Sequence, residues 1–199
     1  MNYFIIQDWQ NTHGNHAGMV HLCKKIKEKD PNNVKLFIIP NIKIRGRNCK
    51  QLQNLLYIAY SLYLFIKIPN DKSKVFLMEY LLPTHNQYFI AKVLSRHKQL
   101  QLYGLAHLVP SDLDKLFKTN SKLKKWAKPI HGFITLGSSL SEYLHNRNIE
   151  RSKIHTMFHY VDSDYYFPSS HKTLFNNASL VKIIIMGRMK RDFDSIIEV

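Results

Sequence analysis

The sequence predicts an α/β fold in which a parallel β-sheet has helices on both of its faces. Short apolar runs rich in Val, Ile, Leu and Phe recur along the chain, and segments with apolar residues at helical spacing lie between them. The apolar runs are continuous rather than alternating, which is typical of strands buried on both faces of a parallel sheet. Strands that alternate with helices in this way indicate βαβ units.

The first half of the chain shows this alternation clearly. A strand is expected at residues 3–7, a helix at 17–29 and a second strand at 34–39. The helix has apolar residues at helical spacing and ends at the sequence DPNN, which favours a turn. Pro40 closes the second strand, because proline cannot donate to a sheet ladder.

The segment 52–68 is long and apolar, but it contains Gln53, Asn54 and Ser61. A helix that spans a membrane needs about 20 predominantly apolar residues, and the uninterrupted runs here are shorter. We therefore expect either a buried helix or a helix that touches a membrane surface.

The second half continues the pattern of strands and helices. Strands are expected at residues 75–82, 100–107, 130–136, 154–158 and 181–186. Helices are expected at residues 86–96, 115–127 and 138–145. Ser138 or Ser139 is expected to cap the last of these helices, because a hydroxyl accepts a hydrogen bond from the first turn.

Composition and charge limit the possible classes of protein. The 199 residues are 45% hydrophobic and 12% aromatic, which excludes a disordered chain. Two cysteines give no disulfide framework and no metal-site spacing, so we expect a reducing, cytoplasmic compartment. The N-terminus lacks the basic segment and cleavage site of a signal peptide.

The net charge of +15 has two interpretations. It reflects either a bias toward Lys codons or attraction to an anionic partner, namely a phosphate ligand, a nucleic acid or an anionic membrane surface. Because ligands of open α/β sheets bind beyond the carboxyl ends of the strands, we expect the site in the loops 8–18, 83–86, 107–112 and 137–139.

Five segments carry a resemblance to a known family. They are HAGMVHLCKKIKEKDPNNVKLF, LYGLAHLVPSD, WAKPIHGFITLGSSLSEYL, KIHTMFHYVDSDYYFP and VKIIIMGRMKRDFD. Their order and spacing resemble the N-terminal half of family 4 glycosyltransferases, which have two Rossmann domains. The sequence departs from the family in having Ala17-Gly18 where a pair of glycines is usual, and it ends before the family's paired glutamates.

The resemblance implies a domain organisation. Residues 1–168 correspond to a Rossmann-like acceptor-side domain, 169–180 to a linker, and 181–199 to the start of a donor-binding domain. It also implies a retaining transferase that needs no metal and no cofactor, with a nucleotide-diphosphate sugar as co-substrate. The acceptor is expected to be a saccharide or a lipid-linked molecule of surface polysaccharide synthesis, and this chain alone is expected to be inactive.

Candidate site residues lie in the first loop. Gly18 is at the expected helix N-terminus, where free N–H groups suit a phosphate or a sugar hydroxyl. An ordinary loop-to-helix junction is the alternative, and the resemblance favours donor binding by Gly18. Asn15 and His16 are candidates for acceptor binding, or else solvated loop residues.

His107 is the candidate catalytic residue. It follows an apolar strand, and the resemblance implies that it binds the donor sugar or stabilises charge at the leaving group. Without the resemblance, a structural histidine at a strand end is the alternative. Glu79 and Tyr80 also end a strand, and for them both a place in the acceptor cleft and burial in an ion pair remain open.

The Gly187 turn is followed by basic residues that suit a diphosphate. Arg188 offers a guanidinium fork, and either Lys190 or Arg191 offers a second charge. The alternative is a basic start of a surface helix.

Two basic patches suggest a membrane surface. One precedes the apolar segment 52–68, and the other flanks Trp126, a residue type that favours membrane interfaces. The patches comprise Lys43, Arg45, Arg47 and Lys50, and Lys122, Lys124, Lys125 and Lys128. A solvated face over a core helix is the alternative for each.

The predicted function is therefore a retaining glycosyltransferase in the cytoplasm, peripheral at the inner face of the cell membrane. The alternative is a basic module that binds nucleic acid or membrane without catalysis. We expect no nucleic-acid partner, because no recognised nucleic-acid motif is present. A dinucleotide-dependent oxidoreductase is disfavoured, because no G-x-G-x-x-G follows a strand.

Overall fold

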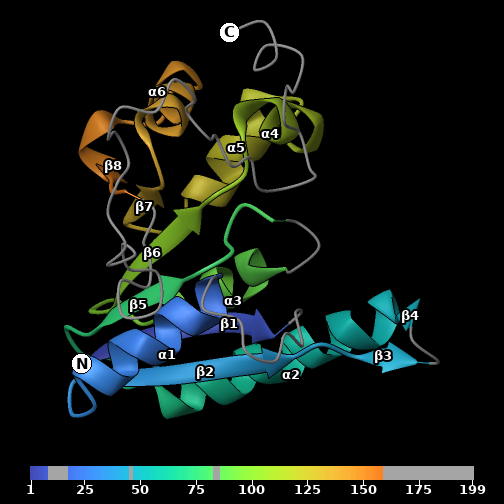
Figure 1. Cartoon of the computed structure of the whole chain (residues 1–199), viewed down its shortest axis with the longest axis vertical. Coiled ribbons are helices and arrows are strands. Elements are labelled where there is room, and N and C mark those ends of the chain that lie inside the picture. Colours follow the sequence, from blue (N-terminus) through green and yellow to red (C-terminus); the bar gives the residue numbers. More distant parts are fainter. Residues whose placement is uncertain (9–17, 45–46, 83–85, 159–199) are drawn as a thin grey trace, which may run out of the picture. The chain divides into compact units, whose positions relative to one another are not determined.

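The computed structural model describes residues 1–8, 18–44, 47–82 and 86–158 (Figure 1). All of these residues belong to one structural unit, Met1–Tyr165. The expected linker at 169–180 and the expected strand at 181–186 lie outside the described residues. Within the described part, no helix is long and apolar enough to cross a membrane.

A six-stranded sheet is the centre of the fold, and all its neighbouring strands are parallel. The strand order is β2-β1-β5-β6-β7-β8. The strands are β1 (Asn2–Asp8), β2 (Val34–Pro40), β5 (Lys74–Leu77), β6 (Gln101–Ala106), β7 (Gly132–Thr135) and β8 (Ile154–Thr156). The predicted Rossmann-like α/β fold is thereby confirmed.

Helices connect the strands, with one short hairpin after β2. The hairpin is β3 (Lys43–Ile44) and β4 (Arg47–Asn48), and a 3₁₀ turn, η2 (Arg151–Lys153), precedes β8. The helices are α1 (Met19–Lys29), α2 (Lys50–Lys67), α3 (Gln87–Leu94), α4 (Pro110–Leu116), α5 (Asn120–Ala127) and α6 (Ser138–Asn146).

Side chains of β1 alternate between two apolar cores. Tyr3 and Ile5 belong to the larger core, which α2 to α6 also enter, whereas Phe4 and Ile6 belong to the smaller core beneath α1. Figure 1 shows α1 in front of the sheet and α2 behind it. The predicted helices on both faces are therefore present.

The helices are unequally divided because parallel connections are right-handed. From β1 the chain moves toward one edge of the sheet, to β2, which puts α1 on one face. From β2 onward it moves toward the opposite edge, through β5, β6, β7 and β8, so the later helices lie on the other face and enter the larger core. On the face of α1 an apolar groove of about 210 Å³ remains, and Phe76, Ile134 and Phe158 are among its lining residues.

Three local expectations were wrong in detail. The helix expected at 115–127 is two helices, because buried Phe117 ends α4 and the Thr119 Oγ1 accepts a hydrogen bond from Lys122 N (3.3 Å) to cap α5. The strand expected at 75–82 ends at Leu77, and a turn follows. Neither Ser138 nor Ser139 is the N-cap of α6; Gly137 takes that place, with φ of 137°.

Candidate functional site at the carboxyl edge of the sheet

The order of the strands places a topological switch point between β1 and β5. From β1 the chain continues to β2 on one side, and from β2 it crosses to β5 on the other. Loops that leave two such strands run in opposite directions, which opens a crevice beyond their carboxyl ends. Asp8 and Leu77 end these two strands, so the expected ligand-binding edge is the one next to them.

Gly18 lies at this edge as the N-cap of α1. Its φ of 88° lies in the left-handed region, which favours glycine, and a Cβ there would meet no atom within 4 Å. Glycine offers no side-chain oxygen to the first turn of the helix, so the backbone N–H groups of that turn face the loop side. The predicted position of Gly18 is thus correct, and its role in donor binding stays a prediction.

The helices α3 and α6 begin in a similar way. The N-cap residues are Asn86, with φ of 44°, and Gly137, and neither makes a side-chain hydrogen bond to the helix. No acidic residue occupies the first turn of α1, α3 or α6. Because these helices follow β1, β5 and β7, the positive ends of their dipoles lie along the carboxyl edge.

His107 follows directly on Ala106, the last residue of β6, and is half-buried. Helix α4 begins three residues later at Pro110. The structure therefore places His107 at the predicted strand end and on the same edge of the sheet as Gly18. In contrast, His131 Nδ1 accepts a hydrogen bond from Leu102 N (3.0 Å), which makes it a structural histidine.

Buried polar side chains hold together the elements next to the carboxyl edge of the sheet. The hydroxyl of Tyr57 donates to Gln7 Oε1 (2.6 Å), and Gln87 Oε1 accepts from Glu79 N (2.9 Å). Gln87 Nε2 donates to the Ile5 carbonyl (3.3 Å), so one side chain joins β1 to the turn after β5. Sequence reasoning missed Gln7 and Gln87, although an amide inside an apolar strand or helix is a signal that can be read.

Glu79 and Tyr80 are both buried. Tyr80 is fully buried, and its hydroxyl donates to the carbonyl of Trp126, so it belongs to the core and not to a cleft. Glu79 is also buried, with 1% of its surface exposed. Burial, followed by the nearby charge of Glu79, raises the pKa of Cys23 to about 12 and raises the pKa of Tyr57 as well.

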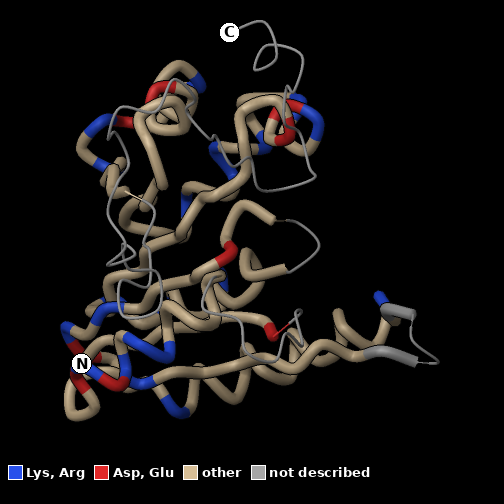
Figure 2. Tube along the Cα trace, in the orientation of Figure 1, with Lys and Arg blue, Asp and Glu red and all other residues tan. Residues whose placement is uncertain are grey.

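The basic patches have different outcomes. Trp126 is buried against Tyr88 and Phe117, so it does not face a membrane, and that expectation was wrong. Lys50 is exposed at the start of α2, and the remaining members of that patch have no described side chains. Figure 2 shows that Lys and Arg are spread over many elements rather than gathered on one.

Several predicted site residues lie outside the described part of the chain. These are Asn15, His16, Arg188, Lys190 and Arg191. In the part that the structure describes, no three His, Cys, Asp or Glu side chains form a cluster that would hold a metal ion.

Comparisons with known protein families, proteins and structures found no match. No protein-family model matches the sequence, and neither a curated protein nor a solved structure matches the chain. The chemistry of the carboxyl edge is therefore the basis on which a function is assigned.

Proposed function

We propose that this chain is the acceptor-side domain of a retaining glycosyltransferase. The reaction moves a sugar from a nucleotide-diphosphate donor to a saccharide or lipid-linked acceptor in surface polysaccharide synthesis. The nucleophile is a hydroxyl of the acceptor, and the leaving group is the nucleoside diphosphate. The central task of the protein is to stabilise the negative charge that develops on that leaving group.

The observation that carries the proposal is the group of helix N-termini at the carboxyl edge. Helices α1, α3 and α6 begin there without side-chain caps and without acidic residues in their first turns. Backbone N–H groups at such ends bind phosphate or sugar oxygens, and the helix dipoles favour negative charge. The positive φ of Gly18 supports close approach of a ligand to the backbone.

His107 is the second support. It is half-buried and directly follows β6, in the loop before α4. From this position its side chain would reach a ligand bound in the crevice. An imidazole there would donate a hydrogen bond to the donor sugar or to the leaving group. In this proposal Arg188, with Lys190 or Arg191, binds the diphosphate, and Asn15 and His16 bind the acceptor.

The test is turnover by the protein expressed from its native gene. Nucleotide sugars with different bases are supplied with a lipid extract as acceptor, and release of nucleoside diphosphate is measured. We expect His107→Ala to lower turnover about a hundredfold or more, in the range of a lost proton-transfer or charge-stabilising group. Donor affinity is expected to change much less.

The matched control is His155→Ala. His155 lies on β8 of the same sheet, and its ring packs at the edge of Tyr103 and beside Gly132, the first residue of β7, so the ring points away from the carboxyl edge. It is expected to leave turnover unchanged. Equal turnover of the His107 variant and the unmodified protein would remove His107 from the mechanism, and no release from any donor would refute the proposed reaction.

A second candidate is a basic binding module without catalysis. Binding to DNA that weakens with salt, without recognition of any nucleotide sugar, would favour a nucleic-acid module. The exposed apolar side chains of α2 instead favour a membrane-binding module.

A further inference from the structure

Helix α2 presents a large apolar face to solvent. Six of the ten large apolar side chains that are exposed in the described part of the chain belong to this one helix. They are Leu52, Leu55, Ile58, Leu62, Tyr63 and Ile66, and Ile66 is 81% exposed. At 3.6 residues per turn these positions fall within an arc of about 140°. Contiguous exposed apolar surface of this kind marks an interaction site.

The opposite face of α2 is polar at several positions, and it is the buried one. Gln53 Oε1 accepts from Ile42 N (2.8 Å), while its Nε2 donates to the Pro40 carbonyl (3.1 Å). Tyr57 bonds Gln7 at the end of β1, and the Ser61 Oγ donates to the Tyr57 carbonyl (2.6 Å).

These bonds fix the rotation of α2 about its axis. Turning the helix to bury Leu55 and Leu62 would break the hydrogen bonds of Gln53 and Tyr57 and leave buried polar groups unsatisfied, which is strongly unfavourable. The outward apolar face is therefore a fixed property of this fold. A helix that is apolar on its outer face needs a partner to cover it.

The charges around this face identify the partner. Helix α2 has no acidic residue and has Lys50 and Lys67 at its two ends. Between residues 43 and 74 the sequence has seven Lys or Arg and one acidic residue, Asp71, which gives a local charge of +6. This combination of apolar face and basic flanks is complementary to an anionic lipid surface.

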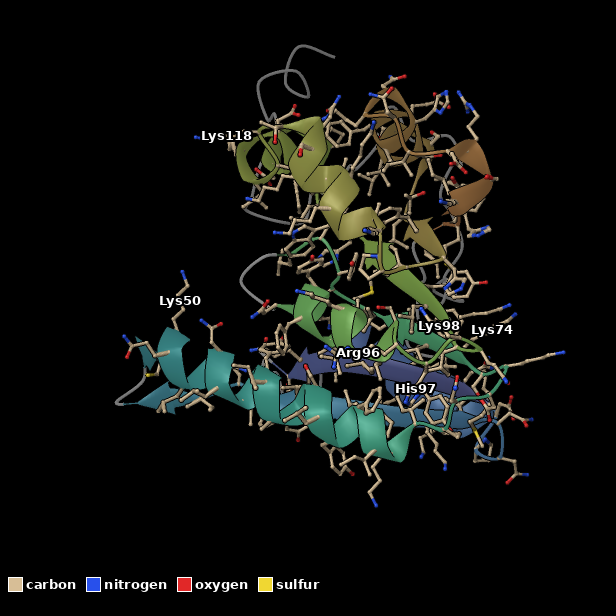
Figure 3. The ribbon with its side chains drawn as sticks, turned by 180° about the vertical axis from the view of Figure 1, so that it is seen from behind. Lys50, Lys74, Arg96, His97, Lys98 and Lys118 are labelled. Carbon is tan, nitrogen blue, oxygen red and sulfur yellow. The ribbon has the colours of Figure 1, made fainter. Side chains whose placement is uncertain are left out.

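Further basic residues lie beside the C-terminal end of α2. The ring of His97 packs on Phe65 of α2, with centroids 4.1 Å apart, and its neighbours Arg96 and Lys98 are exposed. Figure 3 shows Lys50 at one end of the helix and Arg96, His97 and Lys98 near the other. Basic side chains therefore flank both ends of the apolar face.

A second copy of this chain fits the same face poorly. Antiparallel pairing of two α2 helices would bring Lys50 of one copy next to Lys67 of the other, with no acidic residue of α2 to offset the repulsion. An acidic bilayer has the opposite charge. The apolar surface also continues into a groove of about 400 Å³ between α2 and the edge strand β2, lined by Phe37, Ala59 and Tyr63 among others.

We propose that the exposed face of α2 binds the surface of an anionic lipid bilayer, with the helix axis in the plane of the membrane. The 18 residues of α2 span about 27 Å, and the apolar side chains enter the boundary between head groups and acyl chains. Lys67, whose Nζ lies 6.0 Å from the centre of the exposed Tyr63 ring, contacts the acidic head groups. This inference rests on α2 and its neighbours and does not depend on the transfer reaction.

The test is flotation with lipid vesicles, using the whole protein and no nucleotide sugar. Vesicles of phosphatidylcholine alone are compared with vesicles that contain about one third phosphatidylglycerol. We expect binding to the acidic vesicles, weaker binding at high salt, and little binding to the neutral ones. One basic side chain near an acidic surface strengthens binding about fivefold, so Lys67→Gln should weaken binding about fivefold.

The apolar contribution is tested with a triple variant, Leu55→Gln, Leu62→Gln and Ile66→Gln. These side chains are exposed, so the fold should persist, and an unchanged thermal unfolding midpoint would confirm that. We expect vesicle binding to fall at least about tenfold, because apolar burial drives interfacial binding. The matched control is Val109→Gln, which changes an exposed apolar residue at the start of α4 and should bind as the unmodified protein does.

Three results would overturn the proposal. One is no binding to acidic vesicles, another is equal binding to neutral and acidic vesicles, and the third is unchanged binding by the triple variant. A concentration-dependent dimer that the triple variant abolishes, in a protein that does not float with vesicles, would assign the face to a second copy. Failure of the transferase assay would leave the vesicle result intact.

Discussion

The ring of Tyr80 lies directly on the backbone of Gly104. A Cβ added to Gly104 would lie 2.5 Å from the Tyr80 Cδ1 atom and 2.6 Å from its Cγ atom. Tyr80 is in turn held by its hydroxyl bond to the Trp126 carbonyl and by ring contacts to Trp126 and Phe133. The glycine in the middle of β6 is thus required by close packing, since its φ is not in the left-handed region.

Replacement of Gly104 by Ala should therefore destabilise the protein through overpacking. We expect the free energy of unfolding to fall by about 1–3 kcal/mol, measured by urea denaturation. The comparison variant is Gly18→Ala, where a Cβ meets no atom and any loss, about 1–3 kcal/mol, comes only from the backbone conformation, with φ of 88° and ψ of 161°. A Gly104→Ala protein as stable as the unmodified one would show that the Tyr80 ring moves away freely.

The Gly104–Tyr80 contact also shows why the sequence left the role of Tyr80 open. A tyrosine that follows an apolar strand can either line a cleft or be buried. Here it is buried because Gly104, on the neighbouring strand, leaves room for its ring. The same reason explains the wrong expectation for Trp126. Its lysine neighbours in the sequence suggest an interface, whereas two of the rings that bury it, those of Tyr80 and Tyr88, belong to segments distant in sequence.

Other features could be predicted because they depend on local signals. Continuous apolar runs indicated the parallel strands, and the expected strand ends placed Gly18 and His107 on one edge of the sheet. The strand order and the network of Gln7 and Gln87 could not be predicted, because they depend on which strands become neighbours. Which face of α2 is buried could not be predicted either, because hydrogen bonds of Gln53 and Tyr57 to other segments of the chain determine it.

Arg147 joins the C-terminal end of α6 to helices α4 and α5. Its guanidinium lies 2.7 Å from Asp114 Oδ1 and donates to the Tyr143 hydroxyl (2.8 Å), the Asn120 side chain and the Phe117 carbonyl. The Arg147 side chain is only 16% exposed. Its loss should leave partners unsatisfied, so Arg147→Ala is expected to cost about 1–3 kcal/mol of unfolding free energy.

Arg151 is the matched control for this prediction. It makes a two-bond pair with Glu142 at 3.0 Å, but its side chain is 62% exposed. Exposed ion pairs contribute about 0–1 kcal/mol, so Arg151→Ala should be nearly neutral. Equal losses in the two variants, measured by urea denaturation, would show that burial of Arg147 adds nothing to the strength of its contacts.

Cys23 links burial to the pH dependence of stability. Cys23 belongs to α1, and its thiol is fully buried between this helix and the sheet. Burial, followed by the nearby charge of Glu79, raises the pKa of the thiol to about 12 from the usual value of 9.0. The protonated thiol is thus favoured in the folded state. Its contribution is fully present below pH 9, where both states keep the proton, and is lost as the pH rises toward 12 because the unfolded chain ionises first.

We therefore expect the free energy of unfolding to fall between pH 9 and the folded pKa of about 12. In a Cys23→Ala protein, which is less stable at neutral pH because of the cavity, this fall should be smaller. Thiol labelling provides an independent measurement at pH 8: half-buried Cys49 should react quickly, and Cys23 only after unfolding in denaturant. Rapid reaction of both thiols in the native protein would mean that α1 opens readily from the sheet, because Cys23 is fully buried in the closed structure.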